Sequence, residues 1–255
     1  MRVTAILNMK GGVGKTTTAV NMAAILARDH KARVLLIDAD SQCNTTEFFG
    51  ADPKGGNLAD ILRQTGPSDL TYAQTCIWKT QYSGVDVMPG DDSLMDLDLS
   101  KVEAGSVNAN VLRLLTRAVA GRYDYILIDC PPAFNAASAA ALIAAHDVII
   151  PIKLDAFSLR GMGNLMRQVK NMHQINPVLK IAGILPTMWY GNPQIQDAEA
   201  QLKAAGLNLF PHIRRSDKVD AMTFRQAPLL ITSPKSGAGV DYRKFVSEYV
   251  KEGAK

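Results

Sequence analysis

The chain has 255 residues, of which 47% are hydrophobic and 20% are charged, and its net charge is +4. This length suffices for one large α/β domain with a buried core, and so mild a charge alone selects no class of partner. The three cysteines show no C-x-x-C spacing, which argues against a disulfide framework or a zinc site and favours a reducing cytoplasm. The apolar N-terminal stretch is too short for a signal peptide. The longest run of small apolar residues, 136–145, is about half of the roughly 20 residues that a membrane span needs.

Strands and helices alternate along the chain. Short apolar runs without polar alternation are typical of parallel strands covered on both faces. They predict strands at residues 2–7, 33–38, 123–129, 147–152 and 180–185. Helical patterns lie between and after them, at residues 15–28, 108–120, 135–145, 158–173, 193–205 and 240–251. The alternation predicts βαβ units, and therefore a doubly wound, mostly parallel sheet with helices on both faces. Ligands of such sheets bind at the carboxyl ends of the strands.

The domain organisation is expected to be simple. Residues 51–70 are rich in Gly, Pro and Asp and are predicted to form an irregular excursion over the surface. Neither a linker nor a repeat divides the sequence, so we expect a single domain over residues 1–255. Because the first strand begins at residue 2, no N-terminal DNA-reading domain is expected. Residues 206–255 carry nine basic and five acidic side chains, so the whole surplus of positive charge lies in this last fifth.

The first candidate site is the glycine-rich loop NMKGGVGKTTT at residues 8–18. It follows a predicted strand and opens a predicted helix, which is the context of a phosphate-binding loop. Its glycines allow successive backbone N–H groups to point at phosphate oxygens, and the helix N-terminus adds a positive end. In this pattern Lys15 reaches the β- and γ-phosphates and Thr16 binds Mg²⁺. The predicted nucleotide-binding residues of the loop are Lys10, Gly11, Gly12, Val13, Gly14, Lys15, Thr16 and Thr17.

Carboxylates end two of the predicted strands. Asp38 and Asp40 close the VLLIDAD run, and their spacing puts both on one face while the strand persists. Either could orient an attacking water near a γ-phosphate, or merely cap the turn. Asp129 closes the run YILID, a Walker B pattern whose carboxylate holds Mg²⁺ directly or through water. Pro131 and Pro132 follow and make a stiff turn.

Four segments together resemble the ParA/MinD group of P-loop ATPases, and within it the ParA-type partition ATPases. They are KGGVGKTTT at 10–18, VLLIDADSQ at 34–42, YILIDCPP at 125–132 and RRSDKVDAMTFRQAPLL at 214–230. The resemblance identifies the loop as a deviant Walker A motif. It implies that Lys10 crosses a dimer interface to the partner's nucleotide while Lys15 acts in cis. It also implies ATP as the nucleotide, Asp40 as the residue that positions water, and Thr16 and Asp129 as Mg²⁺ residues, with Asp40 able to contribute through water.

The match departs from the family pattern in two places. Ser41 and Cys43 stand where the family commonly has Pro and Gly, so the loop after Asp40 is expected to differ in shape. Arg214 stands where the family often has Pro, in a segment that tends to lie near the adenine. We assign the adenine contacts to Thr187 and Met188, which follow the predicted strand 180–185.

The resemblance also implies a function. ParA-type proteins form homodimers with ATP, bind duplex DNA without sequence preference and position a plasmid, a chromosome or another cargo. Their hydrolysis is slow and is stimulated by a ParB-type partner, and the expected location is the cytoplasm, on the nucleoid. The basic surplus suggests the phosphate contacts, which we assign to Arg214, Arg215, Lys218 and Arg225.

Two other functions remain open. A MinD-type positioning ATPase would bind membrane through an amphipathic C-terminal helix, but the tail YRKFVSEYVKEGAK mixes charge signs without a clear apolar face. No membrane partner is therefore expected. A metabolic P-loop ATPase of the same superfamily would need a small-molecule pocket with dedicated polar residues, which the sequence does not identify.

Overall fold

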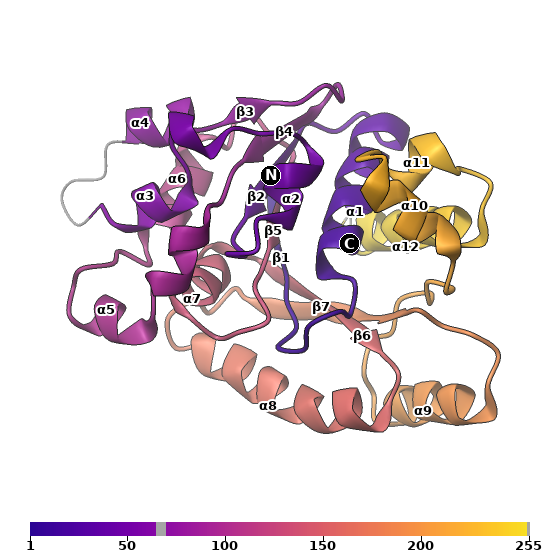
Figure 1. Ribbon diagram of the computed structural model, residues 1–255. Helices are drawn as coiled ribbons and strands as arrows, with labels where there is room; N and C mark the ends of the chain where they lie inside the picture. Colours follow the sequence, from indigo (N-terminus) through magenta and orange to yellow (C-terminus); the bar gives the residue numbers. More distant parts are fainter. Residues whose placement is uncertain (65–69, 254–255) are drawn as a thin grey trace.

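A twisted sheet forms the centre of the computed structural model, which describes residues 1–64 and 70–253. The seven strands run in the order β3-β4-β2-β5-β1-β6-β7 (Figure 1). All neighbours are parallel except β3, which pairs antiparallel with β4 at one edge. The strands are β1 (Arg2–Ile6), β2 (Val34–Asp38), β3 (Trp78–Lys79), β4 (Val85–Met88), β5 (Tyr125–Asp129), β6 (Asp147–Lys153) and β7 (Lys180–Thr187).

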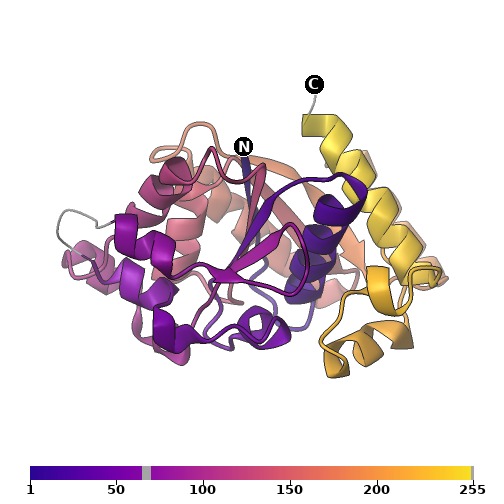
Figure 2. The same cartoon turned by 90° about the horizontal axis from the view of Figure 1, so that it is seen from above.

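Helices cover both faces of the sheet, and each face has its own apolar core (Figures 1 and 2). One core is shared with α1 (Lys15–Asp29), α2 (Asn44–Phe48), α10 (Asp217–Phe224), α11 (Leu229–Thr232) and α12 (Gly237–Gly253). The other is shared with α3 (Leu58–Leu62), α4 (Leu70–Thr75), α6 (Val111–Ala118), α7 (Ala136–Ala144), α8 (Ala156–Met172) and α9 (Pro193–Ala204). The short α5 (Leu99–Glu103) packs against α7, and two 3₁₀ turns, η1 (Pro53–Gly55) and η2 (Asp92–Asp96), complete the described elements. The predicted doubly wound, mostly parallel sheet is thus confirmed.

Strand β4 was not predicted from the sequence. It is only four residues long and carries an acidic residue, Asp86, which interrupts the apolar run. The structure shows how that carboxylate is accommodated: it accepts hydrogen bonds from the Tyr123 hydroxyl and the Lys79 ammonium group, each at 2.7 Å. A buried acid with two donors is tolerated in a strand that packs on both faces.

The expectation of an irregular segment at residues 51–70 was partly wrong. Helix α3 lies within it, and a capping box starts that helix. The Asn57 side chain accepts hydrogen bonds from the N–H groups of Ala59 (2.8 Å) and Asp60 (3.2 Å), while the Asp60 carboxylate accepts one from the N–H of Asn57. Residues 65–69 lie outside the described part of the chain.

Strand β1 lies where the order of the strands changes direction. The chain first builds β2, β4 and β5 on one side of β1 and then β6 and β7 on the other. The carboxyl ends of β1, β2 and β5 lie next to one another, and Asp129 is the register partner of both Ile6 and Asp38. In open α/β sheets this point is where the flanking loops part and leave a ligand crevice.

At the amino ends of the central strands, Arg2, Asp147 and Tyr249 form a clasp that joins the two ends of the described chain. The Arg2 guanidinium donates to the Asp147 carboxylate and to the carbonyl of Tyr249 (3.0 Å), and it lies 3.9 Å from the centre of the Tyr249 ring. This clasp joins β1, β6 and α12. Among residues 1–64 and 70–253, no helix is both long enough and apolar enough to pass through a lipid bilayer.

Candidate functional site

The glycine loop joins β1 to α1 at the crevice edge. Gly12 and Gly14 adopt positive φ angles of 69° and 83°, a conformation that side-chain-bearing residues rarely take. Gly14 is also the N-cap of α1, and no side chain caps the helix there. The first N–H groups of α1 therefore stay available to an anion at the positive end of the helix.

The side chain of Lys15 lies inside this loop. It is buried, and its Nζ donates to the carbonyl of Lys10 at 3.1 Å, so it crosses the inside of the loop. Burial lowers the pKa of Lys15, and the charges of Asp129 and Asp40 oppose that shift. The lysine and the two carboxylates thus face one another around the same space.

The carboxylates of Asp38 and Asp129 lie side by side below the loop. Both are fully or almost fully buried. Burial and the neighbouring charge of Asp38 raise the pKa of Asp129 to about 7, against hydrogen bonds from Thr16 and Thr45 that lower it. Burial likewise raises the pKa of Asp38 to about 6, against hydrogen bonds from Thr46. Two acids this close cannot both ionise freely without a cation or strong donors.

Of the two carboxylates, Asp129 fits a magnesium ion. Asp129 Oδ1 is buried and has no hydrogen-bond partner among the described residues, while Oδ2 accepts from Thr45. An unpartnered buried carboxylate oxygen is costly unless a cation or its water completes it. Mg²⁺ prefers one or two carboxylates together with phosphate oxygens and water. Thr16 and Asp129 could therefore hold Mg²⁺, with Asp40 nearby.

Lys10 points out of the loop rather than into it. Its Nζ donates to both Asp155 carboxylate oxygens (2.9 and 2.8 Å) and to the Ser158 hydroxyl (2.9 Å). Asp155 is the N-cap of α8, accepting from the Ser158 N–H at 2.9 Å. Burial alone would raise the pKa of Asp155, but the hydrogen bonds from Lys10 and Ser158 outweigh it and hold the pKa at about 2. This acceptor pair was not predicted from the sequence, although an Asp at the start of a helix is a recognisable N-cap signal.

A crevice of about 350 Å³ lies beside the loop on the β7 side. Thr187 and Met188, the predicted adenine contacts, line it, and the Thr187 hydroxyl donates to the Val13 carbonyl at 2.9 Å. The segment Ile213–Asp217 forms the opposite wall, together with side chains that the sequence analysis did not single out: Tyr190, Val219, Asp220 and Tyr242. The size and position suit a nucleoside, while the individual base contacts stay predictions.

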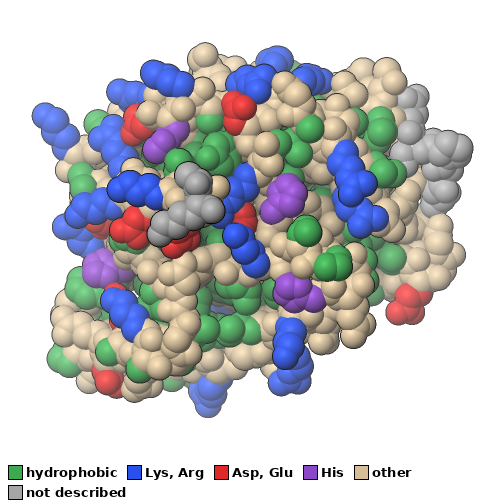
Figure 3. Space-filling view, turned by 180° about the vertical axis from the view of Figure 1, so that it is seen from behind, with side chains coloured by type: hydrophobic (Ala, Val, Ile, Leu, Met, Phe, Trp, Pro, Cys, Tyr) green, Lys and Arg blue, Asp and Glu red, His purple; other side chains and the backbone are tan. Residues whose placement is uncertain are grey.

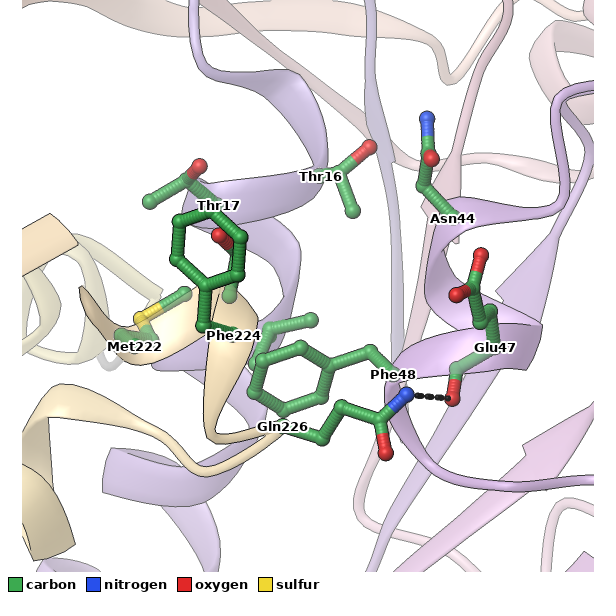
Figure 4. Close-up of a pocket in the computed structure, with 10 residues that line it drawn as sticks. Thr16, Thr17, Asn44, Glu47, Phe48, Met222, Phe224 and Gln226 are labelled. Carbon is green, nitrogen blue, oxygen red and sulfur yellow. Dashed lines mark hydrogen bonds between the residues drawn. The ribbon is translucent and has the colours of Figure 1, made fainter. Parts of the chain in front are cut away.

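A second cavity, of about 600 Å³, lies on the other side of α1 (Figure 4). Thr16 and Thr17 of α1 face it from one side and Asn44 and Glu47 of α2 from the other. The Gln226 side-chain amide donates to the Glu47 carbonyl at 3.2 Å, which ties α2 to the segment after α10. Met222, Thr223 and Phe224 of α10 complete the lining of this cavity, and Phe224 is 90% exposed.

The four predicted DNA-binding residues fall into two groups. Arg214 is exposed but paired: its Nε and Nη2 donate to the two carboxylate oxygens of Asp241 at 2.8 and 2.9 Å. Arg214 also lines the nucleoside-sized crevice. Arg215, Lys218 and Arg225 are exposed on or beside α10. Aspartates distant in sequence, such as Asp241, cannot be paired with Arg214 before the fold is known.

A strand, a glycine loop with an inward lysine, a helix N-terminus and a neighbouring strand that ends in aspartate together define a P-loop nucleotide-binding protein. Comparison with known proteins agrees. A family model described as "AAA domain" matches residues 1–181. The chromosome partitioning protein ParA of Caulobacter vibrioides is 39% identical over 196 residues, covering 74% of this chain and 70% of that protein. The chain therefore belongs to the ParA/MinD-type P-loop ATPases.

Solved structures place it in the same group. A complex of McdA from Cyanothece with ATP has a TM-score of 0.85 at 25% identity, covering 100% of this chain and 96% of that one. Cobyrinic acid a,c-diamide synthase from Mycobacterium smegmatis, with a bound ATP analogue and magnesium, has a TM-score of 0.82 at 28% identity and the same coverage. Structures with nucleotide and magnesium support binding of both in this family.

Proposed function

We propose that this protein is an ATP-driven dimerising switch. In its ATP form it pairs with a second copy, binds nonspecific duplex DNA and positions a plasmid, a chromosome or another cargo, on the nucleoid in the cytoplasm. The observation that carries this proposal is that two lysines of the loop point in opposite directions. Lys15 turns into its own phosphate loop, whereas Lys10 turns away from it and is held at the rim, on Asp155. A lysine so placed is suited to serve a nucleotide other than its own.

Binding of a partner's nucleotide could supply enough free energy to release Lys10 from Asp155. The side chains of Lys10 and Asp155 are 38% and 28% exposed, and a half-exposed ion pair contributes only about 0–1 kcal/mol. A phosphate group of a partner's ATP carries more negative charge than one carboxylate. Exchange of Asp155 for that phosphate would therefore favour the closed dimer.

Hydrolysis within the closed dimer uses residues already in place. Asp40 is buried at the crevice edge, where its carboxylate accepts from the Gln42 N–H at 3.0 Å and can orient a water molecule. Lys15, with Lys10 of the second copy, stabilises charge on the transferring phosphoryl group. Mg²⁺ bound at Thr16 and Asp129 would neutralise phosphate charge. We expect a slow reaction that a ParB-type partner accelerates and that reopens the dimer.

DNA binding rests on the exposed basic residues near the C-terminus. Lys218 lies in α10, Arg215 precedes the helix and Arg225 follows it, and all three are exposed. Helix α10 lies on the face seen in Figure 1; the opposite face also shows more Lys and Arg than acidic side chains (Figure 3), so positive charge is not confined to α10. Contacts of this kind act on phosphates and carry no sequence preference. A dimer presents two such surfaces and gains affinity through avidity.

Gel filtration and DNA binding with ATP, with ADP and without nucleotide test the proposal. We expect a dimer that binds DNA of any sequence only with ATP, and a monomer without DNA affinity in the other two states. Lys15→Ala, which removes the cis lysine, is the control that should not respond to ATP. A monomer in all three states would overturn the proposal.

The MinD-type alternative is less well supported by α12. Phe245, Val246 and Tyr249 of this helix are fully buried against α1 and the sheet, so they offer no apolar face to a membrane. Co-sedimentation with liposomes in the presence of ATP, without DNA binding, would favour that alternative. Similarity to the cobyrinic acid synthase keeps a metabolic function open, and ADP release stimulated by cobyrinic acid would reveal it.

A further inference from the structure

The first turn of helix α2 contains two adjacent threonines, Thr45 and Thr46, which bind two different carboxylates. The Thr45 hydroxyl donates to Asp129 Oδ2 at 2.8 Å. The Thr46 hydroxyl and backbone N–H both donate to Asp38 Oδ2 at 2.7 Å. Thr45 is 0% exposed and Thr46 is 4% exposed. The first turn of α2 is therefore fixed to the ends of strands β2 and β5.

The two hydroxyls differ in what they leave free. Thr46 Oγ1 also accepts from the Gly90 N–H at 3.0 Å, and Asp38 Oδ1 accepts from the Asp40 N–H at 3.2 Å, so every oxygen in that group is engaged. At Asp129 the Thr45 hydroxyl donates to Oδ2, and the Thr16 hydroxyl also helps to lower the pKa of this carboxyl, while the buried Oδ1 has no hydrogen-bond partner among the described residues. A donor on Oδ2 limits the rotation of the carboxylate and so directs Oδ1.

We infer that Thr45 is a positioning residue for the magnesium site: its hydroxyl holds Asp129 so that Oδ1 faces the metal. This inference rests on the proposed role of Asp129 toward Mg²⁺. Residues that hydrogen-bond a metal-binding carboxylate typically contribute about 10- to 100-fold to metal affinity. Thr45 thereby also links the metal to α2, whose Asn44 and Glu47 line the cavity beside the loop helix (Figure 4).

A merely structural role for Thr45 makes a different prediction. If the hydroxyl only satisfied a buried acid, its loss would weaken the packing of α2, as the loss of the neighbouring Thr46 hydroxyl would. The two residues offer a matched pair, since they are adjacent, both buried, and both donate at nearly the same distance. Only Thr45 donates to the carboxylate with a free oxygen.

The test titrates Mg²⁺ against binding of a fluorescent ADP analogue to the full chain. In wild type we expect nucleotide affinity to rise with Mg²⁺. Thr45→Val keeps the shape of the side chain without the hydroxyl and should raise the half-maximal Mg²⁺ concentration about 10-fold or more. Thr45→Ser should restore it, and Thr46→Val should stay within about twofold of wild type, because its lost bond goes to Asp38.

The outcomes distinguish the proposed role of Asp129 toward Mg²⁺ from the positioning role of Thr45. If wild type binds nucleotide independently of Mg²⁺, the proposed role of Asp129 itself fails. If wild type responds but Thr45→Val titrates as wild type does, or shifts no more than Thr46→Val, the positioning role of Thr45 is overturned. Circular dichroism and the melting temperature verify that each variant is folded. Should Thr45→Val not fold, Thr45→Ala against Thr46→Ala applies the same comparison.

Discussion

At the scale of single residues, we expect Lys10 to decide whether the protein forms a dimer with ATP. We expect Lys10→Ala to retain nucleotide binding by the monomer but to lose ATP-dependent dimerisation, because Lys15 already serves the loop from inside. Asp155→Asn should do the opposite. It removes the charge that holds Lys10, so dimers should form at a lower ATP concentration. Analytical ultracentrifugation over an ATP series measures both. Normal dimers of Lys10→Ala would exclude a role in trans.

Asp40 is the residue to which we assign the water. Asp40→Ala should lower ATP turnover by about 100-fold or more, within the range typical of a lost group that activates a nucleophile, without preventing ATP binding. An ATP-bound dimer should then accumulate, and DNA should remain bound. Phosphate release and gel filtration of the same sample test this together. Turnover at the wild-type rate would show that Asp40 does not position the attacking water.

Asp129 should make stability depend on pH in a defined direction. An exposed Asp titrates near pH 3.9, whereas the pKa of Asp129 in the fold is raised to about 7. Between these values the native state holds a proton that the unfolded chain has lost. The free energy of unfolding therefore falls as pH rises through this window, and none of this loss is present below it.

Asp129→Asn should remove that loss, since an amide does not titrate. In melts at pH 5 and pH 8 without Mg²⁺, the variant should gain relative to wild type at pH 8. For a domain of this size about 1 kcal/mol corresponds to roughly 2–4 °C. Mg²⁺ should raise the melting temperature of nucleotide-bound wild type but not of the variant. Equal gains at both pH values would contradict the raised pKa.

At the scale of elements, α10 and the segment before it carry the proposed DNA surface. Replacing Arg215, Lys218 and Arg225 together by Ala should weaken DNA binding on every sequence. If all three contact phosphates, the slope of log affinity against log salt should fall by about 3, since each contact contributes roughly 0.9. Arg214→Ala is the informative comparison, because that side chain is held by Asp241. An unchanged slope in the triple variant would place the DNA elsewhere.

The elements also show what sequence patterns can and cannot predict. Strands β1, β2, β5, β6 and β7 and the long helices α1, α8, α9 and α12 follow apolar patterns that are set locally, and the sequence predicted them. Strand β4 was missed because Asp86 is stabilised by Tyr123, which lies far away in the sequence. The loop, Asp38, Asp40 and Asp129 were found because chemistry and strand ends coincide there.

At the scale of the whole molecule, the parts that escaped prediction are long-range pairs. Asp155 meets Lys10 across 145 residues, Thr45 meets Asp129 across 84, and Asp241 meets Arg214 across 27. Each pair joins side chains whose partners become neighbours only once the chain has folded. The sequence therefore singled out the loop and carboxylate residues that the fold brings together, while their assignment to phosphate and Mg²⁺ stays a prediction; it did not show which residues hold them.

The clasp of Arg2 with Asp147 and Tyr249 bears on how the molecule comes apart. It joins the first strand to the last helix at the amino ends of the strands, away from the predicted nucleotide crevice at their carboxyl ends. Fraying usually begins at chain ends that nothing ties down. Here β1 is central in the sheet and α12 is packed on α1, so neither end can peel away alone. Opening of the clasp should require unfolding of the whole domain, and a nucleotide bound at the far edge should slow hydrogen exchange at both ends of the chain.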